Sequence, residues 1–241
     1  MTMSLTLNRQ ESSAPPLSFP LPIEVVVIDL DGTLLDTAPD LAYAANQMLA
    51  ELNQPPLDME LVASYVGNGV SRLVKRVLTK SRDGEPEAEY FSRALPIFEK
   101  HYGAHVSQSS RPFPGIVEGI KELRARGFRL ACITNKAERF TIPLLKDTEL
   151  LDAFELVLSG DSLPKTKPDP LPLLHAMSHF GITPQQLLMI GDSINDIQAA
   201  RSAGCPVFCV TYGYQGGHAI DHADALLSSL LDALPLIKKA V

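Results

Sequence analysis

The chain has 241 residues, of which 45% are hydrophobic and 20% are charged, a composition typical of a folded protein in water. Its formal net charge of −7 offers no basic footprint for nucleic acid or for an anionic membrane surface. No apolar run approaches the roughly 18 residues that a membrane span requires, so we expect neither a nucleic-acid nor a membrane partner.

Residues 1–20 open the chain with a polar, proline-containing stretch, which predicts a disordered tail without chemistry. This stretch lacks a basic region followed by an apolar core, so it is not typical of a secretory signal. Cys132, Cys205 and Cys209 lie in apolar runs, and their odd number without metal-ligand spacing predicts small buried side chains rather than disulfides or a zinc site. We therefore expect a cytoplasmic location.

Strand-like and helical patterns alternate through most of the remaining chain. Short apolar runs predict strands at 24–29, 128–133, 155–159, 187–191, 206–211 and, more weakly, 224–227. Helical patterns fall between the later strands, at 115–126, 136–146, 170–180 and 193–203. This alternation predicts an α/β fold, with a Rossmann-like parallel sheet core that carries helices on both faces.

The segment 36–112 differs, because it contains no convincing strand. Its apolar spacing predicts helices at about 38–53, 58–65, 69–80 and 86–103. Because the segment follows the first strand of the sheet directly, it would lie over the edge where ligands bind, as an all-helical cap. The alternative is a helical unit without contact to the chemistry. The predicted organisation is a tail (1–20), a catalytic core (21–35 and 113–241) and a helical cap (36–112).

Two carboxylates, Asp29 and Asp31, end the first predicted strand. Side chains two residues apart on a strand point the same way, so both acids would converge at the carboxyl end of a buried strand. Gly32 then permits a tight turn. A divalent cation, or separate nucleophile and acid roles, would relieve the repulsion between the two acids. The alternative is a solvated turn, which Asp and Gly also favour.

Two further strand ends carry groups that suit a phosphate. Thr134 and Asn135 follow the second predicted strand, where a hydroxyl, an amide and a helix N-terminus can bind phosphate oxygens. Lys167 precedes the helix after the third strand and can neutralise clustered negative charge, with Lys165 as a nearby competitor. Taken singly, an ordinary helix cap and a solvated lysine are the simpler interpretations.

A second acidic pair, Asp192 and Asp196, follows the strand at 187–191. If a helix begins at Ser193, one acid lies at the strand end and the other on the first helical turn. Hard oxygen ligands of this kind suit Mg²⁺, which prefers one or two carboxylates together with phosphate and water. The alternative is an N-cap with acids in the first turn, which helix termini favour.

Four motifs occur in a fixed order, each at a strand end: the acidic pair, Thr-Asn, Lys-Pro and Gly-Asp-x-x-x-Asp. With these motifs, on Asp29/Asp31, Thr134, Lys167 and Asp192/Asp196, the chain resembles the haloacid dehalogenase-like hydrolases over residues 22–235. Finer similarities are shared with bacterial phosphoglycolate phosphatases. They comprise Asp36-Thr37-Ala38-Pro39-Asp40-Leu41, Val66-Gly67-Asn68-Gly69-Val70, and Ala203-Gly204-Cys205-Pro206 before Thr211-Tyr212-Gly213-Tyr214.

Residue chemistry and resemblance together imply one mechanism. Asp29 would be the nucleophile that forms an aspartyl-phosphate, and Asp31 the general acid and base. Mg²⁺ would bind Asp29, the backbone carbonyl of Asp31 and Asp192. The remaining roles are binding of the phosphoryl group by Thr134 and Asn135, neutralisation by Lys167, orientation of Lys167 or a metal-bound water by Asp196, and support of the substrate loop by Thr33.

The predicted cap is expected to choose the substrate. Gly67-Asn68-Gly69 is a turn that opens a helix, so backbone N–H groups near Asn68 and Gly69 can meet a small anion. Arg72, one turn further along, can pair with a substrate carboxylate such as that of glycolate. A solvated helix face is an equally good interpretation of Arg72. His101 and His105, near the end of a cap helix, are expected to be structural or exposed.

These features predict a Mg²⁺-dependent phosphatase acting on a small phosphorylated metabolite, with 2-phosphoglycolate as the implied substrate. The alternatives are a phosphatase of another small ester or pyrophosphate, a sugar phosphomutase, and a non-catalytic phosphate-binding protein. The sequence is compatible with a monomer or a homodimer.

Overall fold

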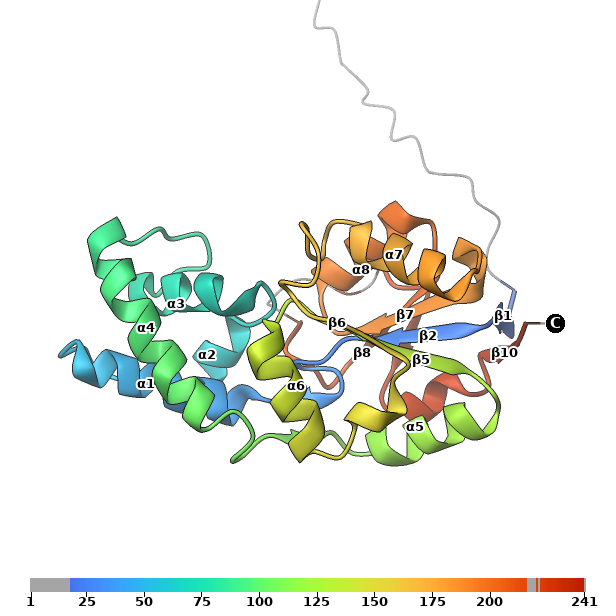
Figure 1. Cartoon of the computed structure of the whole chain (residues 1–241), viewed down its shortest axis with the longest axis horizontal. Coiled ribbons are helices and arrows are strands. Elements are labelled where there is room, and N and C mark those ends of the chain that lie inside the picture. Colours follow the sequence, from blue (N-terminus) through green and yellow to red (C-terminus); the bar gives the residue numbers. More distant parts are fainter. Residues whose placement is uncertain (1–17, 216–219, 221, 241) are drawn as a thin grey trace, which may run out of the picture.

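The structure is a computed structural model that describes residues 18–215, 220 and 222–240. The predicted disordered tail, up to residue 17, lies outside the described residues. A six-stranded parallel sheet with the order β6-β5-β2-β7-β8-β9 forms the centre of the core (Figure 1). Its strands are β2 (Val25–Ile28), β5 (Arg129–Ile133), β6 (Leu156–Leu158), β7 (Leu187–Gly191), β8 (Val207–Val210) and β9 (Ala225–Leu227).

Helices cover both faces of this sheet, which confirms the predicted Rossmann-like α/β class. The helices are α5 (Ile116–Ala125), α6 (Glu138–Asp147), α7 (Leu171–Phe180) and α8 (Ile194–Ala203), with α7 and α8 on one face and α5 on the other (Figure 1). Strand β2 is buried on both faces: Val25 and Val27 join the α7/α8 core cluster, and Val26 and Ile28 join the cluster on the opposite face. This two-sided burial explains the continuous apolar run that precedes Asp29.

The register of the sheet brings three strand ends together. Ile28 at the end of β2 pairs with Cys132 of β5 on one side and with Ile190 of β7 on the other. Because parallel strands end at the same edge, the residues that follow β2, β5 and β7 meet at one place. The candidate site is built on this edge.

Four helices lie between the core segments and pack on one another at one end of the molecule (Figure 1). They are α1 (Ala38–Glu51), α2 (Met59–Ser64), α3 (Gly69–Thr79) and α4 (Ala88–Ala104). The chain enters this group through β3 (Leu35–Asp36) and leaves it through β4 (Arg111–Pro112), and the two strands pair antiparallel. Buried Asp40 of α1 accepts hydrogen bonds from the backbone N–H groups of Ser109 and Ser110, which fastens the exit segment to the entry helix.

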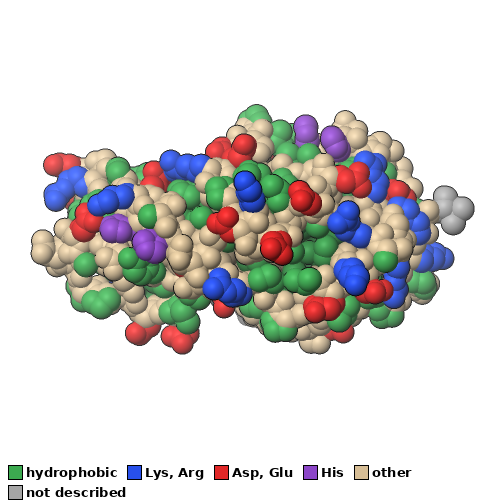
Figure 2. All heavy atoms as spheres, turned by 60° about the horizontal axis from the view of Figure 1, so that its bottom comes forward, with side chains coloured by type: hydrophobic (Ala, Val, Ile, Leu, Met, Phe, Trp, Pro, Cys, Tyr) green, Lys and Arg blue, Asp and Glu red, His purple; other side chains and the backbone are tan. Residues whose placement is uncertain are grey.

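Short strands were not expected from the sequence. The pair β3–β4, and a parallel pair of β1 (Leu21–Ile23) with β10 (Ile237–Lys239), have two or three residues each, too few for an alternating pattern. The cysteines are buried and free, as predicted. Within the described residues no helix is both long and apolar enough to span a membrane. On the face in Figure 2, acidic and basic side chains are interspersed.

Candidate active site

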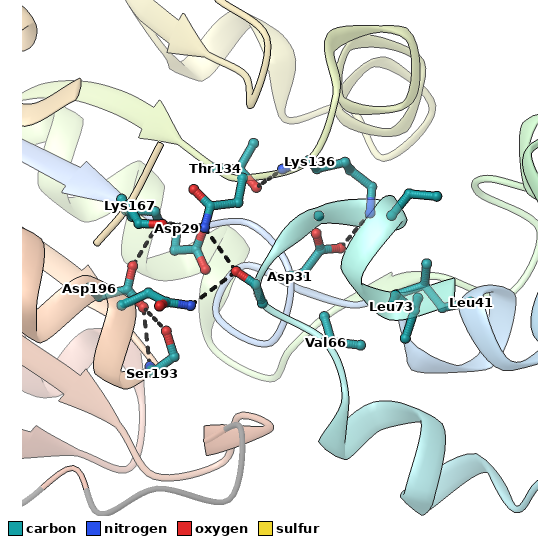
Figure 3. Close-up of a pocket in the computed structure, with 15 residues that line it drawn as sticks. Asp29, Asp31, Leu41, Val66, Leu73, Thr134, Lys136, Lys167, Ser193 and Asp196 are labelled. Carbon is teal, nitrogen blue, oxygen red and sulfur yellow. Dashed lines mark hydrogen bonds and ion pairs between the residues drawn. The ribbon is translucent and has the colours of Figure 1, made fainter. Parts of the chain in front are cut away.

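Asp29 and Asp31 stand where β2 ends, at the middle of the sheet edge (Figure 3). The backbone N–H of Asp29 donates to the carbonyl of Ile190, so the first acid is still held by the sheet. Gly32 follows with a φ of +83°, and a Cβ there would collide with a carboxylate oxygen of Asp192. Glycine is therefore required twice over, by its backbone conformation and by the close approach of the second acidic motif.

Lys167 lies at the Asp29 end of the site and is almost wholly buried. Its Nζ contacts Oδ1 of Asp29 at 2.8 Å and Oδ1 of Asp196 at 2.7 Å, and it donates to the carbonyl of Ile133 at 2.7 Å. An ammonium group has three N–H donors, so these contacts use all of them. The simple interpretation of Lys167 as a solvated surface group is excluded by this geometry.

Asp29, Asp192 and Asp196 form a buried acidic group whose ligand atoms lie within 4.8 Å of one another. Oδ1 of Asp196 contacts Lys167, and its Oδ2 accepts from the N–H and hydroxyl of Ser193, so both of its oxygens are engaged. Oδ2 of Asp192 accepts from the backbone N–H groups of Tyr214 and Gln215. The other oxygens of Asp29 and Asp192 remain as candidate ligands, a hard donor set that fits a divalent cation.

Burial and mutual repulsion make these acids hard to ionise. Burial, followed by the charge of Asp196, raises the pKa of Asp29 to about 7 against the opposing charge of Lys167. Burial and the charges of Asp196 and Asp29 raise the pKa of Asp192 to about 8. Burial alone would lower the pKa of Lys167, but Asp196 and Asp29 raise it above its usual value, so the lysine stays charged. A bound cation would therefore stabilise the ionised form of this acidic group.

A cation at this group should bind more tightly as pH rises. Carboxylates bind a cation only when ionised, and Asp29 and Asp192 have pKa values raised to about 7 and about 8. Between pH 6 and pH 8 we expect the Kd for Mg²⁺ to fall by at least about tenfold, with proton release on binding. Isothermal titration calorimetry in two buffers of different ionisation enthalpy measures both quantities.

The raised pKa values of Asp29 and Asp192 also determine how the stability of the protein changes with pH. Both pKa values are higher in the folded state than in the unfolded state. The contribution of the two acids to the free energy of unfolding is therefore fully present below about pH 4 and is lost as pH rises through 7 to 8. The melting temperature of the chelated protein should fall across this window, and Mg²⁺ should oppose the fall. A Mg²⁺ affinity that is independent of pH would contradict the titration of both acids.

Thr134 and Asn135 follow β5 as predicted, and both line the pocket. The hydroxyl oxygen of Thr134 accepts from the backbone N–H of Lys136 at 3.2 Å. The side-chain amide of Asn135 donates to the carbonyls of Gly67 and Lys167, at 2.9 and 2.8 Å. The Asn135 side chain therefore links the core to the helical segment, and its backbone remains the part available to a phosphoryl group.

Lys136 is a site residue to which the sequence analysis gave no role. It is 4% exposed, its Nζ lies 2.7 Å from Oδ1 of Asp31, and it stands 4.9 Å from the ring centroid of Tyr102 in α4. The hydroxyl of Thr37 donates to the same oxygen of Asp31 at 2.6 Å. With Oδ1 held by two donors, Oδ2 of Asp31 is left for a reacting group. The available signal was the position of Lys136, directly after Thr-Asn at a strand end.

Tyr214 also went unassigned, although its motif had been noted. Its hydroxyl donates to Asp36 at 2.7 Å and accepts from the backbone N–H groups of Thr37 and Ala38. Its own N–H donates to Asp192 at 2.7 Å. One residue thus connects a candidate metal ligand to the start of α1.

A pocket between the sheet edge and the helical segment contains the site. It measures about 450 Å³ including its open mouth. One end is polar, with Asp29, Asp31, Thr134, Lys136 and Lys167 among its residues. The helical segment 36–112 supplies Leu41, Val66, Val70 and Leu73, together with Gly67 and Gly69. This is a small pocket with its charged side chains on the core side.

Three expected substrate residues lie elsewhere. The guanidinium of Arg72 is 2.5 Å from Glu85 and donates to the carbonyl of Arg82, and Arg72 is not among the residues that line the pocket. Thr33 is buried behind the site, with its hydroxyl 3.4 Å from Asp192. Asn68 is exposed and contacts Asn195, while neighbouring Gly69 does line the pocket.

His101 and His105 are structural. His101 contacts Glu51 at 2.7 Å and His105 stacks on Tyr43, on helices α1 and α4. Neither residue belongs to the pocket lining.

Fold and site together define a Rossmann-like α/β hydrolase whose acidic centre is neutralised by a buried lysine. The family model for haloacid dehalogenase-like hydrolases matches residues 26–210. The chain therefore belongs to the haloacid dehalogenase-like hydrolase family, as the motifs predicted.

Similar proteins come from several bacteria. The phosphoglycolate phosphatase of Thiobacillus denitrificans is 61% identical over 225 residues, covering 92% of this chain and 99% of that protein. The phosphoglycolate phosphatase of Nitrosospira multiformis is 56% identical, covering 93% and 100%. A crystal structure of a predicted phosphoglycolate phosphatase from Haemophilus somnus has a TM-score of 0.81 at 35% identity, covering 88% of this chain and 96% of that one. These relatives are phosphoric monoester hydrolases, and this chain shares their fold over nearly their full length.

Proposed function

We propose that this protein is a Mg²⁺-dependent phosphatase that hydrolyses 2-phosphoglycolate to glycolate and phosphate through an aspartyl-phosphate. The observation that carries the proposal is the arrangement at the end of β2, where Asp29, Asp31 and Lys167 line one small pocket and Asp192 belongs to the same buried acidic group as Asp29. The names of the relatives at 61% and 56% identity support the substrate.

In this mechanism a carboxylate oxygen of Asp29 attacks phosphorus, and Lys167 contacts Oδ1 of the same group. Asp31 gives a proton to the leaving alkoxide and later takes one from the attacking water. Thr134 and the backbone of Asn135 bind the transferring phosphoryl group, and Lys167 offsets its charge. Asp196 positions Lys167, because its Oδ1 holds the ammonium and its Oδ2 is anchored on Ser193.

Asp29, the backbone carbonyl of Asp31 and Asp192 are the residues that would hold Mg²⁺. The donor set fits a divalent cation, since all three groups offer oxygen atoms. The raised pKa values of Asp29 and Asp192 indicate that added positive charge would stabilise both carboxylates. When bound, the ion supplies positive charge that offsets the phosphate ester and the carboxylates.

Residues 36–112 would act as the cap that selects the substrate. Their contribution to the pocket is apolar side chains and the backbone of Gly67 and Gly69, which limits the space above the reacting group. A small ester fits such a chamber better than a sugar phosphate with several hydroxyl groups to satisfy.

The test is phosphate release from 2-phosphoglycolate with Mg²⁺, beside glucose 1-phosphate, pyrophosphate and a panel of other phosphomonoesters. We expect kcat/KM for 2-phosphoglycolate to exceed that for every other ester by about tenfold or more. Equal or better turnover of another ester would keep the chemistry and reject the named substrate. No turnover of any ester would favour a phosphomutase or a non-catalytic phosphate-binding protein.

A further inference from the structure

Two buried lysines line the pocket, and they differ in how many of their N–H donors have acceptors. Lys167, at the Asp29 end, has three acceptors for its three N–H donors. Lys136, at the Asp31 end, has one acceptor among the described residues, Oδ1 of Asp31. Its remaining donors face the Tyr102 ring and the pocket that it lines. Lys136 is thus the buried cation in the pocket that still has N–H donors available for a ligand.

A second unsatisfied group lies beside it. The hydroxyl of Tyr102 is buried and has no hydrogen-bond partner within the part of the chain that the structure describes. Buried hydroxyl groups are rarely left in this state, because the lost hydrogen bond with water is not replaced. Tyr102 does not line the pocket and lies next to Lys136, so the ammonium of Lys136 is the group that an anionic oxygen ligand in the pocket would meet.

Among the described residues, the helical side of the pocket offers no other cation. Its side chains there are Leu41, Val66, Val70 and Leu73, and Arg72 is engaged by Glu85 outside the pocket. Figure 3 shows Lys167 beside Asp29, and Lys136 reaching Asp31 on the side of Leu41 and Leu73. A substrate with a phosphate at one end and a second anion a few bonds away would place them at these two lysines.

We propose that Lys136 recognises the carboxylate of the substrate and thereby selects phosphate esters that carry a second anionic group. This inference rests on the proposed function. It assigns to the core the specificity role that the sequence suggested for Arg72. No covalent change is involved: the ammonium keeps its contact with Asp31 and uses its other donors on the carboxylate.

The test uses two pairs of compounds that differ by the carboxylate. The substrates are 2-phosphoglycolate and ethyl phosphate; the inert inhibitors are 3-phosphonopropionate and propylphosphonate. In Lys136→Met, kcat/KM for 2-phosphoglycolate and the affinity for 3-phosphonopropionate should fall by about 10- to 150-fold. Because Lys136 also contacts Asp31, turnover of ethyl phosphate should fall as well, but the ratio of kcat/KM for 2-phosphoglycolate to that for ethyl phosphate should still drop by about tenfold or more, and the affinity for propylphosphonate should change by less than about threefold. Lys165→Met, which removes an exposed lysine paired with Asp169, is the matched control and should change none of them.

Loss of activity on both esters alike would overturn the proposal and assign Lys136 to holding Asp31. Unchanged selectivity would overturn it as well. If Lys136→Met does not fold, Lys136→Gln keeps a donor for Asp31 without the charge, and the same selective loss is expected. The inhibitors separate this inference from the proposed function, because binding of 3-phosphonopropionate needs no turnover. A wild-type protein that binds both inhibitors equally rejects the carboxylate site, whereas absent turnover with selective binding rejects only the reaction.

Discussion

Asp29→Asn is expected to lower kcat for 2-phosphoglycolate by at least about 10⁴-fold, because an amide cannot form the phosphoryl intermediate. The fold should survive, because the amide has the shape of the carboxyl group and burial raises the pKa of Asp29 to about 7, so that loss of its charge costs little in the metal-free protein. Single-turnover and steady-state phosphate release with saturating Mg²⁺ measure the loss, and thermal denaturation checks the fold.

Asp152→Asn, at an exposed position outside the pocket, is the matched control and should keep wild-type activity. Intact-mass spectrometry of the Asp29→Asn preparation guards against deamidation back to aspartate. Turnover within tenfold of the wild type would show that Asp29 is not the nucleophile.

Lys167→Met should reduce both activity and stability. The variant leaves Asp29 and Asp196 buried without their cation, and breaking a buried ion pair from one side costs about 3–5 kcal/mol of unfolding free energy. For a chain of this size the melting temperature should drop by about 6–20 °C in the absence of metal. Loss of charge stabilisation at the phosphoryl group should lower kcat by a further about 10²–10³-fold.

Mg²⁺ should restore part of the stability of Lys167→Met, because a divalent cation supplies the missing charge to the same acids. Calorimetry with and without chelator measures this recovery, and Lys165→Met again serves as the lysine control. A melting temperature and a kcat close to those of the wild type would contradict a central role for Lys167.

The strand ends were predictable because local pattern and chemistry agree there. Apolar runs that stop at Asp29, Thr134 and Asp192 mark both the end of a buried strand and the start of polar function, and the parallel fold then brings these ends together. The lengths of the helices and of the principal strands follow from the same periodicity. Two- and three-residue strands such as β3 and β4 carry no such pattern, so only the structure reveals them.

Contacts between distant side chains were beyond the sequence. Lys136 and Asp31 are 105 positions apart, and nothing in the spacing of either motif indicates that their charges meet. The same holds for Arg72: its helix could be predicted, but the loop that brings Glu85 to its guanidinium could not. Tyr214 joins Asp192, 22 positions away, to the start of α1, 176 positions away, through the path of a loop.

The paired strands β3 and β4 restrict how the pocket can open. The chain passes between the core and helices α1 to α4 through these two strands, which are tied by their ladder and lie side by side. Swinging about this double connection preserves the ladder, whereas sliding would break it. The direct polar ties at the mouth are few among the described residues: Asn135 and Asn195 both donate to the carbonyl of Gly67, and Asn68 donates to Asn195. Opening the pocket at Gly67 therefore requires three amide contacts to break, while the backbone of Asp29 stays fixed to the sheet.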